Sequence, residues 1–248
     1  MSFVGASKTG LCHEVTRPLP LEAVNGPLDP QSLMSRRGAL LKAGACLAAS
    51  SCLSAFGSVP AADSSPITVP AYFWSQKRWV WLQRAATGEE IKLVYWANGA
   101  VIPEAYQKLS WFLRDLRFER MIAESSPVIG RALNDGRLVR NQVTQWALMD
   151  PIVLDVLYAY SAWLAGYGMS RPLVVTSGFR HFLSNELTEG AELAGWHPRA
   201  GAVDFTIPGV SAENAARFGI WLAGGGVGLY RSKNFTHVDR GRVRAWSS

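Results

Sequence analysis

Two neighbouring segments near residue 80 carry the pattern of an antiparallel hairpin. Residues 78–84 (RWVWLQR) alternate in part between apolar and polar side chains, and residues 90–96 (EIKLVYW) are rich in residues that favour strands. Thr87, Gly88 and Glu89 lie between them and are typical of a turn. The pattern therefore predicts two paired strands at the start of the folded part of the chain.

Three longer segments have helical periodicity and a recognisable first residue. Pro103 opens a pattern in which apolar side chains recur along one helical face. Asp150 and Pro151 supply an N-cap and a first-turn proline for a strongly apolar helix. Ser211 is well placed to cap a third helix, which ends at the glycines after Leu222.

The remaining patterned segments are short, and most of them predict strands. Residues 183–192 predict a short helix, whereas residues 125–145 are polar and weakly patterned, which indicates an irregular segment within an insertion over about residues 119–148. The order of elements lacks a strand–helix–strand rhythm, so we expect an α+β fold with a mainly antiparallel sheet and flanking helices. We expect the last two strands to pair. The predicted strands are residues 173–176, 202–207, 227–230, 235–239 and 243–246.

The amino-terminal quarter of the chain carries the pattern of an export signal. Arg36 and Arg37 precede a weakly apolar run over residues 39–56, and small residues around Ala61 follow. This order is typical of a twin-arginine signal peptide, which directs an already folded protein to the periplasm and leaves no stable membrane span after cleavage. A chance arginine pair before a buried helix is the alternative.

These patterns divide the chain into four parts. Met34 directly precedes the twin-arginine pattern, so the residues before it are either a disordered extension or the result of a mis-assigned start. The predicted parts are residues 1–33 (extension), 34–62 (signal peptide), 63–76 (linker) and 77–248 (one folded domain).

The composition argues against a nucleic-acid partner and against any cysteine-based site in the folded part of the chain. The 248 residues carry a formal net charge of +6 without a cluster of lysine and arginine, so no nucleic-acid partner is expected. The three cysteines are Cys12, Cys46 and Cys52. The chain after residue 52 therefore has no disulfide, thiolate metal site or cysteine nucleophile, and any metal must bind to histidine and carboxylate side chains.

Histidine and aspartate residues in the last quarter of the chain have the spacing of a metal site. His197 lies on a predicted loop before Asp204 in the next strand, so both side chains can reach one point. His237 and Asp239 are two apart in a predicted strand and therefore share a face. Two imidazoles and one carboxylate are a recurrent zinc set that leaves a position for water, and Asp239 is the best placed carboxylate to accept the proton of that water. Histidines that are only buried and hydrogen-bonded are the alternative.

This region carries a series of motifs, which are Ser177-Gly178-Phe179-Arg180, Asn185, His197 with Asp204, residues 225–230 (GGVGLY) and residues 234–239 (NFTHVD). In their order and spacing these motifs resemble the murein endopeptidase K group of the D-Ala-D-Ala zinc peptidases, which share a fold with lysostaphin-type peptidases and the hedgehog signalling domain. The resemblance covers about residues 78–246.

The resemblance implies both a metal site and a substrate. It implies a zinc ion bound by His197, Asp204 and His237, in an enzyme that hydrolyses peptide cross-links of peptidoglycan. It also implies that Arg180 acts in catalysis by holding a carboxylate or carbonyl group of the wall peptide, which suits its planar guanidinium. Ser177 is expected to support this substrate-binding site.

One departure from the family pattern concerns the catalytic carboxylate. Many relatives place it three residues before the last metal-binding histidine, where this chain has Asn234. An amide cannot accept a proton, so either Asp239 does so or the base differs, and Asn234 is expected to contact the substrate. Two alternatives to an endopeptidase remain, namely a non-catalytic peptidoglycan-binding module with the same fold and a D,D-carboxypeptidase.

Overall fold

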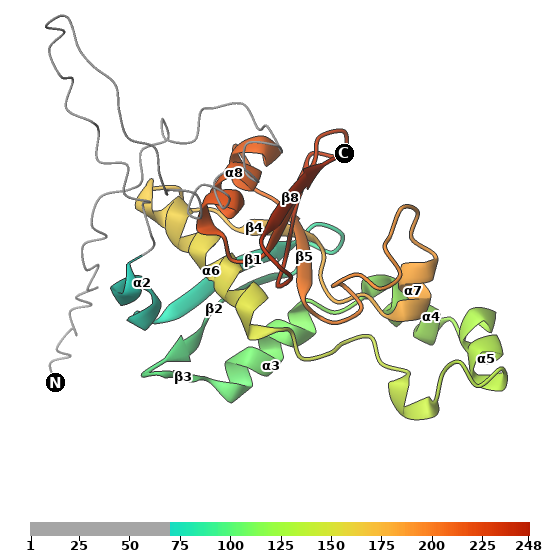
Figure 1. Ribbon diagram of the computed structural model, residues 1–248. Helices are drawn as coiled ribbons and strands as arrows, with labels where there is room; N and C mark the ends of the chain where they lie inside the picture. Colours follow the sequence, from blue (N-terminus) through green and yellow to red (C-terminus); the bar gives the residue numbers. More distant parts are fainter. Residues whose placement is uncertain (1–69) are drawn as a thin grey trace, which may run out of the picture.

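The computed structural model describes residues 70–248 (Figure 1). The predicted extension and signal peptide, residues 1–33 and 34–62, lie outside the described residues, as does the first half of the predicted linker, residues 63–69. The end of that linker forms a short helix, α2 (Ala71–Ser75). Its Phe73 ring stacks on Tyr158 with 4.8 Å between ring centroids, so this segment packs against the domain.

Within residues 70–248, eight strands form one sheet in the order β3-β2-β1-β4-β5-β7-β6-β8. Most neighbouring pairs are antiparallel, and only β1 with β4 and β6 with β8 are parallel. The predicted α+β fold with a mainly antiparallel sheet is therefore confirmed. The strands are β1 (Arg78–Arg84), β2 (Glu90–Ala97), β3 (Ala100–Val101), β4 (Leu173–Ser177), β5 (Ala202–Thr206), β6 (Gly226–Tyr230), β7 (Phe235–Asp239) and β8 (Arg244–Ser247).

Two pairing predictions have different outcomes. The hairpin is confirmed, because β1 and β2 pair antiparallel and Gly88 has a φ of +74° in the turn between them. The pairing of β8 beside β7 is wrong. Both edges of β7 are already occupied by β5 and β6, so β8 pairs with the free edge of β6.

Helices α6 (Pro151–Gly166) and α8 (Ala212–Leu222) pack on one face of the sheet, while α3 (Pro103–Phe112) follows β3 (Figure 1). Their predicted caps are present, since Asp150 accepts a hydrogen bond from the Ile152 N–H and Ser211 accepts one from the Asn214 N–H. The buried side chains of the sheet on this face include Val80, Leu82, Leu173, Val175, Val203, Phe205 and Val238.

The core fixes the direction of the other strand residues. Val203 and Phe205 are fully buried in the core, and Val238 is only 1% exposed. Because side chains alternate between the two faces of a strand, Asp204 and His237 point to the face opposite α6 and α8. The candidate metal ligands therefore share the second face of the sheet.

The polar segment after α3 is helical, contrary to the expectation of irregular structure over residues 125–145. Ser126 caps a helix that starts with Pro127, and Ile129 and Leu138 are buried with Phe118 in a hydrophobic cluster separate from the main core. Long-range packing against α7, rather than local periodicity, stabilises this segment. The elements are α4 (Leu116–Ala123), α5 (Pro127–Asn134), the 3-10 helix η2 (Arg140–Gln142) and α7 (Phe182–Glu186).

The predicted helix over residues 183–192 is shorter in the structure. It ends with α7 at Glu186, and the chain then runs without regular structure to β5. Among the helices of residues 70–248, none is both long and apolar enough to cross a membrane.

Candidate metal centre

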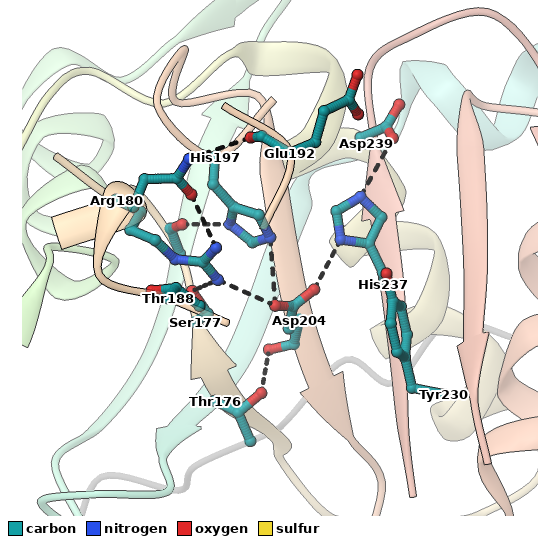
Figure 2. Close-up of polar contacts among 12 residues, drawn as sticks. Thr176, Ser177, Arg180, Thr188, Glu192, His197, Asp204, Tyr230, His237 and Asp239 are labelled. Atoms are coloured by element: carbon teal, nitrogen blue, oxygen red, sulfur yellow. Dashed lines mark hydrogen bonds and ion pairs between the residues drawn. The ribbon is translucent and has the colours of Figure 1, made fainter. Parts of the chain in front are cut away.

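The three predicted metal ligands lie together on the second face of the sheet (Figure 2). Asp204 on β5 and His237 on β7 are direct cross-strand partners, so the register of the sheet sets their separation. Nδ1 of His237 lies 2.7 Å from Oδ1 of Asp204, and Nε2 of His197 lies 3.2 Å from Oδ2 of the same carboxylate. One potential ligand atom from each residue lies within 4.8 Å of the others, which is close enough for one shared ion.

A backbone carbonyl directly after β4 fixes the orientation of His197, which lies on the loop before β5. Nδ1 of His197 lies 2.7 Å from the Gly178 carbonyl oxygen. Since a carbonyl only accepts, Nδ1 carries a proton and donates it, so Nε2 is the nitrogen that is directed at Asp204 and available to a metal.

Asp239 fixes the orientation of His237. Nε2 of His237 donates to Oδ2 of Asp239 at 3.1 Å, so Nδ1 is the nitrogen available to a metal. The Asp239 carboxylate also accepts two hydrogen bonds from Arg244, at 2.8 and 3.0 Å, and further ones from the N–H groups of Gly241 and Gly226. Its side chain has no exposed surface. The arrangement is that of a carboxylate that orients a ligand histidine.

The electrostatics of the site favour a bound cation. Burial alone would raise the pKa of Asp204, but the imidazoles of His197 and His237 outweigh burial and hold that pKa far below its usual range. Burial alone would lower the pKa of His237, but hydrogen bonds to Asp204 and Asp239 outweigh it and raise the pKa to about 9. The cluster therefore holds positive charge next to the Asp204 carboxylate, and a metal ion would take the place of a proton.

The donor set fits zinc. It consists of two imidazole nitrogens and one carboxylate oxygen, and each ring has its second nitrogen held by an acceptor, as is usual for metal-binding histidines. Three protein ligands leave a fourth position for water or substrate, which is typical of catalytic rather than structural zinc.

Arg180 lies beside this centre and is held on three sides. Its Nη2 donates to Oγ of Ser177 at 2.9 Å, its Nη1 donates to Oδ1 of Asn185 at 3.0 Å, and Nη2 is 3.6 Å from Oδ2 of Asp204. Asn185 in turn donates to the Glu192 carbonyl. Burial lowers the pKa of Arg180, although the side chain keeps some exposed surface. The predicted partners Ser177 and Arg180 are thus in contact (Figure 2).

A cavity of about 290 Å³ opens above the centre. One side of the cavity, here named the sheet wall, consists of Asp204, Tyr230, His237, Asp239 and Trp246 from strands β5 to β8. The opposite side, here named the loop wall, is the segment 188–196 between α7 and His197, whose residues other than Leu193 and Ala194 line the cavity.

Two predicted residues lie apart from the cavity lining. Asn234 has a φ of +48° in the turn before β7, and its neighbours Lys233 and Phe235 line the cavity whereas Asn234 does not. His181 also lies apart from the cavity, because it is buried and stacks on Phe118 with 3.6 Å between ring centroids. Of the expected substrate-binding residues, only Arg180 lines the cavity. Ser177 does not line it but accepts a hydrogen bond from Arg180.

Three residues of the site were missed by sequence reasoning. Tyr230 and Trp246 line the cavity, and Arg244 pairs with Asp239. The alternation of β6 could have placed Tyr230 on the face of His237. No local signal could have placed Arg244 and Trp246, because they reach the site only through the pairing of β8 with β6.

A model of one known protein family matches part of the chain. The Peptidase M15 family model matches residues 134–239, a range that contains Arg180 and the three candidate ligands. The match covers less than half of the chain and agrees with the fold and with the geometry of the centre.

Two individual relatives are similar to a larger part of the chain. The chain is 28% identical over 169 residues to the peptidoglycan L,D-endopeptidase MepK of Escherichia coli strain K12, which covers 66% of this chain and 78% of the relative. It is 27% identical over 165 residues to a probable peptidoglycan L,D-endopeptidase MepK of Haemophilus influenzae, which covers 64% of this chain and 74% of the relative. No solved structure matches the chain significantly.

Proposed function

We propose that the protein is a zinc-dependent peptidase that hydrolyses peptide cross-links of bacterial peptidoglycan. The observation that carries the proposal is the convergence of His197, Asp204 and His237 beside a cavity, in a chain similar to peptidoglycan L,D-endopeptidases. By analogy with these relatives, the bond cut is a cross-link between an L- and a D-configured centre.

The ligand atoms would be Nε2 of His197, Nδ1 of His237 and the Asp204 carboxylate. When bound, zinc would supply a Lewis acid that polarises the scissile carbonyl and activates water. Asp239 would not be the base in this scheme. We assign it the role of orienting His237, because its oxygens are already hydrogen-bonded to Arg244, Gly241 and Gly226 and it is buried.

Arg180 would bind the wall peptide next to the reacting bond. Its guanidinium is fixed by Ser177 and Asn185 and lines the cavity, so its remaining N–H groups can hold a carboxylate or carbonyl oxygen of the substrate. In the reaction the water oxygen bonds to the carbonyl carbon, the C–N bond breaks, and the leaving nitrogen takes up a proton from the water.

Purified cell-wall sacs test this proposal. The full chain with zinc should release shorter muropeptides from them, and chelation by EDTA should stop the release. Product masses separate an endopeptidase, which opens cross-links, from a D,D-carboxypeptidase, which removes one terminal residue. An unchanged muropeptide profile in the presence of zinc would reject the enzyme.

A non-catalytic wall-binding module is the second candidate function. Asn234 at the position of the usual acid, together with the fully buried Asp239, favours it. This candidate predicts that the chain sediments with the sacs without altering their muropeptides.

We further propose that the protein acts in the periplasm and is exported by the twin-arginine route. The proposal is supported by the order of the pattern, in which Arg36 and Arg37 precede an apolar run and then a group of small residues. It is also supported by the similarity to peptidoglycan endopeptidases. Replacing Arg36 and Arg37 by lysine should leave the protein in the cytoplasm, as cell fractionation would show. Undiminished export of this variant would contradict the route.

A further inference from the structure

Tyr230 occupies a defined position on the sheet wall that the chemistry described so far does not use. Its strand β6 pairs with β7 so that Gly228 is opposite His237 and Tyr230 is opposite Phe235. Residues two apart on a strand share a face, so Gly228 and Tyr230 lie on the face of the metal centre. Figure 2 shows the Tyr230 ring extending towards His237, with its hydroxyl oxygen at the end nearer the imidazole.

The absence of a side chain at Gly228 allows an indole to reach the centre. A Cβ atom at this position would lie 2.6 Å from Cε2 of Trp246, so the Trp246 ring occupies that space. The ring centroids of Trp246 and His237 are 5.3 Å apart. Trp246 therefore packs next to a candidate ligand and also reaches Tyr230.

The contact between the two aromatic residues orients the tyrosine hydroxyl. Nε1 of Trp246 donates to Oη of Tyr230 at 3.3 Å. An indole N–H can only donate, so the phenol oxygen accepts and its own proton is left for another acceptor. Within residues 70–248 that proton has no protein acceptor, and Tyr230 lines the cavity. The hydroxyl is thus a fixed donor available to a ligand in the cavity.

Packing holds the phenol ring in place. The ring stacks on Phe235 with 4.4 Å between centroids and 11° between planes. Donors that are held in position before the reaction stabilise developing charge more effectively than mobile ones, because no reorganisation is needed. The stacked ring and the Trp246 N–H together provide such an arrangement.

We propose that Tyr230 is a catalytic residue that donates a hydrogen bond to the carbonyl oxygen of the scissile peptide bond. The role rests on the proposed peptidase function. As the water oxygen bonds to the carbonyl carbon, the π electron pair moves onto the carbonyl oxygen, and the Tyr230 O–H donates to the resulting negative charge while keeping its proton. When the C–N bond breaks, the pair returns to re-form the carbonyl, and the leaving nitrogen carries a proton from the water.

The variant Tyr230→Phe removes one hydroxyl group and keeps the stacked ring. We expect kcat on a soluble cross-linked muropeptide to fall about 100-fold, the usual loss on removing one oxyanion donor, while KM, zinc content and Tm stay near wild type. Trp246→Phe removes the N–H that orients the hydroxyl and should give an intermediate loss. Tyr72→Phe, in an exposed residue of α2, is the matched control and should change nothing.

A binding measurement distinguishes a Tyr230 hydroxyl that donates to the developing charge from a Tyr230 side chain that only lines the cavity. A phosphinate analogue of the cross-link carries a negative oxygen where the reaction develops one, so Tyr230→Phe should weaken its binding about as much as it lowers kcat, and binding of the product peptide should be unaffected. Full activity and unchanged phosphinate affinity in Tyr230→Phe would overturn this role alone. A wild-type protein that cleaves no wall peptide would overturn the proposed function, and the role of Tyr230 with it.

Discussion

The two walls of the cavity are built in opposite ways. On the sheet wall, Asp204 and His237 are cross-strand partners, and Asp239 is 1% exposed within a network of hydrogen bonds. On the loop wall, Glu192 is exposed and Leu193 is 70% exposed, in a segment without regular structure. The comparison teaches that two of the three candidate ligands, together with the residue that orients one of them, lie on paired strands, while the facing wall is an exposed loop in which sequence changes cost little.

The largest effect is expected where the sheet wall supplies its central ligand. Asp204→Ala should reduce release of muropeptides to background, because both imidazoles lose the carboxylate they share. The measurement is the muropeptide profile of digested sacs. Asp135→Ala, at an exposed position after α5, is the control and should retain full activity. Cleavage by Asp204→Ala at the wild-type rate would show that the sheet wall does not carry the chemistry.

The variant Asp239→Asn distinguishes a carboxylate that orients His237 from one that acts as the base. If Asp239 orients His237, zinc affinity should fall roughly 10- to 100-fold, and excess zinc should restore most of the activity. Competition with a metal-binding dye measures the affinity. Normal zinc affinity combined with activity that zinc does not restore would instead identify Asp239 as the base.

Arg180 lines the cavity but belongs to neither wall, and its replacement should have a smaller effect. Arg180→Lys keeps the charge but removes the planar guanidinium that donates to both Ser177 and Asn185. We therefore expect kcat/KM to fall about 10-fold with unchanged zinc content. Arg137→Lys, in an exposed ion pair with Glu186, is the matched control and should be near neutral. Loss of zinc from Arg180→Lys would place Arg180 in the metal centre rather than the substrate site.

The smallest effect is expected on the loop wall. Leu193→Ser should change the free energy of unfolding by less than about 0.5 kcal/mol and leave zinc content unchanged, because the side chain is mostly exposed. Thermal unfolding and metal analysis check both quantities. A loss of bound zinc would mean that the loop wall is as much part of the centre as the sheet wall.

Strand alternation made part of the sheet wall predictable. His237 and Asp239 share a face because they are two apart in β7, and the buried Val203 and Phe205 direct Asp204 to the same side. The hairpin and the capped helices followed from equally local signals at Gly88, Asp150 and Ser211. These elements are specified within a few residues of sequence.

Other features depend on contacts between distant segments and left no local signal. The parallel pairing of β8 with β6 brings Arg244 to Asp239 and Trp246 to His237, and it depends on which sheet edge remains free. The segment 125–145 is partly helical because its apolar side chains pack with Phe118 and Leu183 in a separate cluster. Neither result follows from periodicity within a single segment.

The zinc content of the purified full chain tests the central claim most directly. We predict roughly one zinc ion per chain in the wild type and almost none in His197→Ala, since three protein ligands become two. Wild-type protein that retains no zinc after dialysis against a zinc-containing buffer, or a His197→Ala variant with the same content as wild type, would contradict the account.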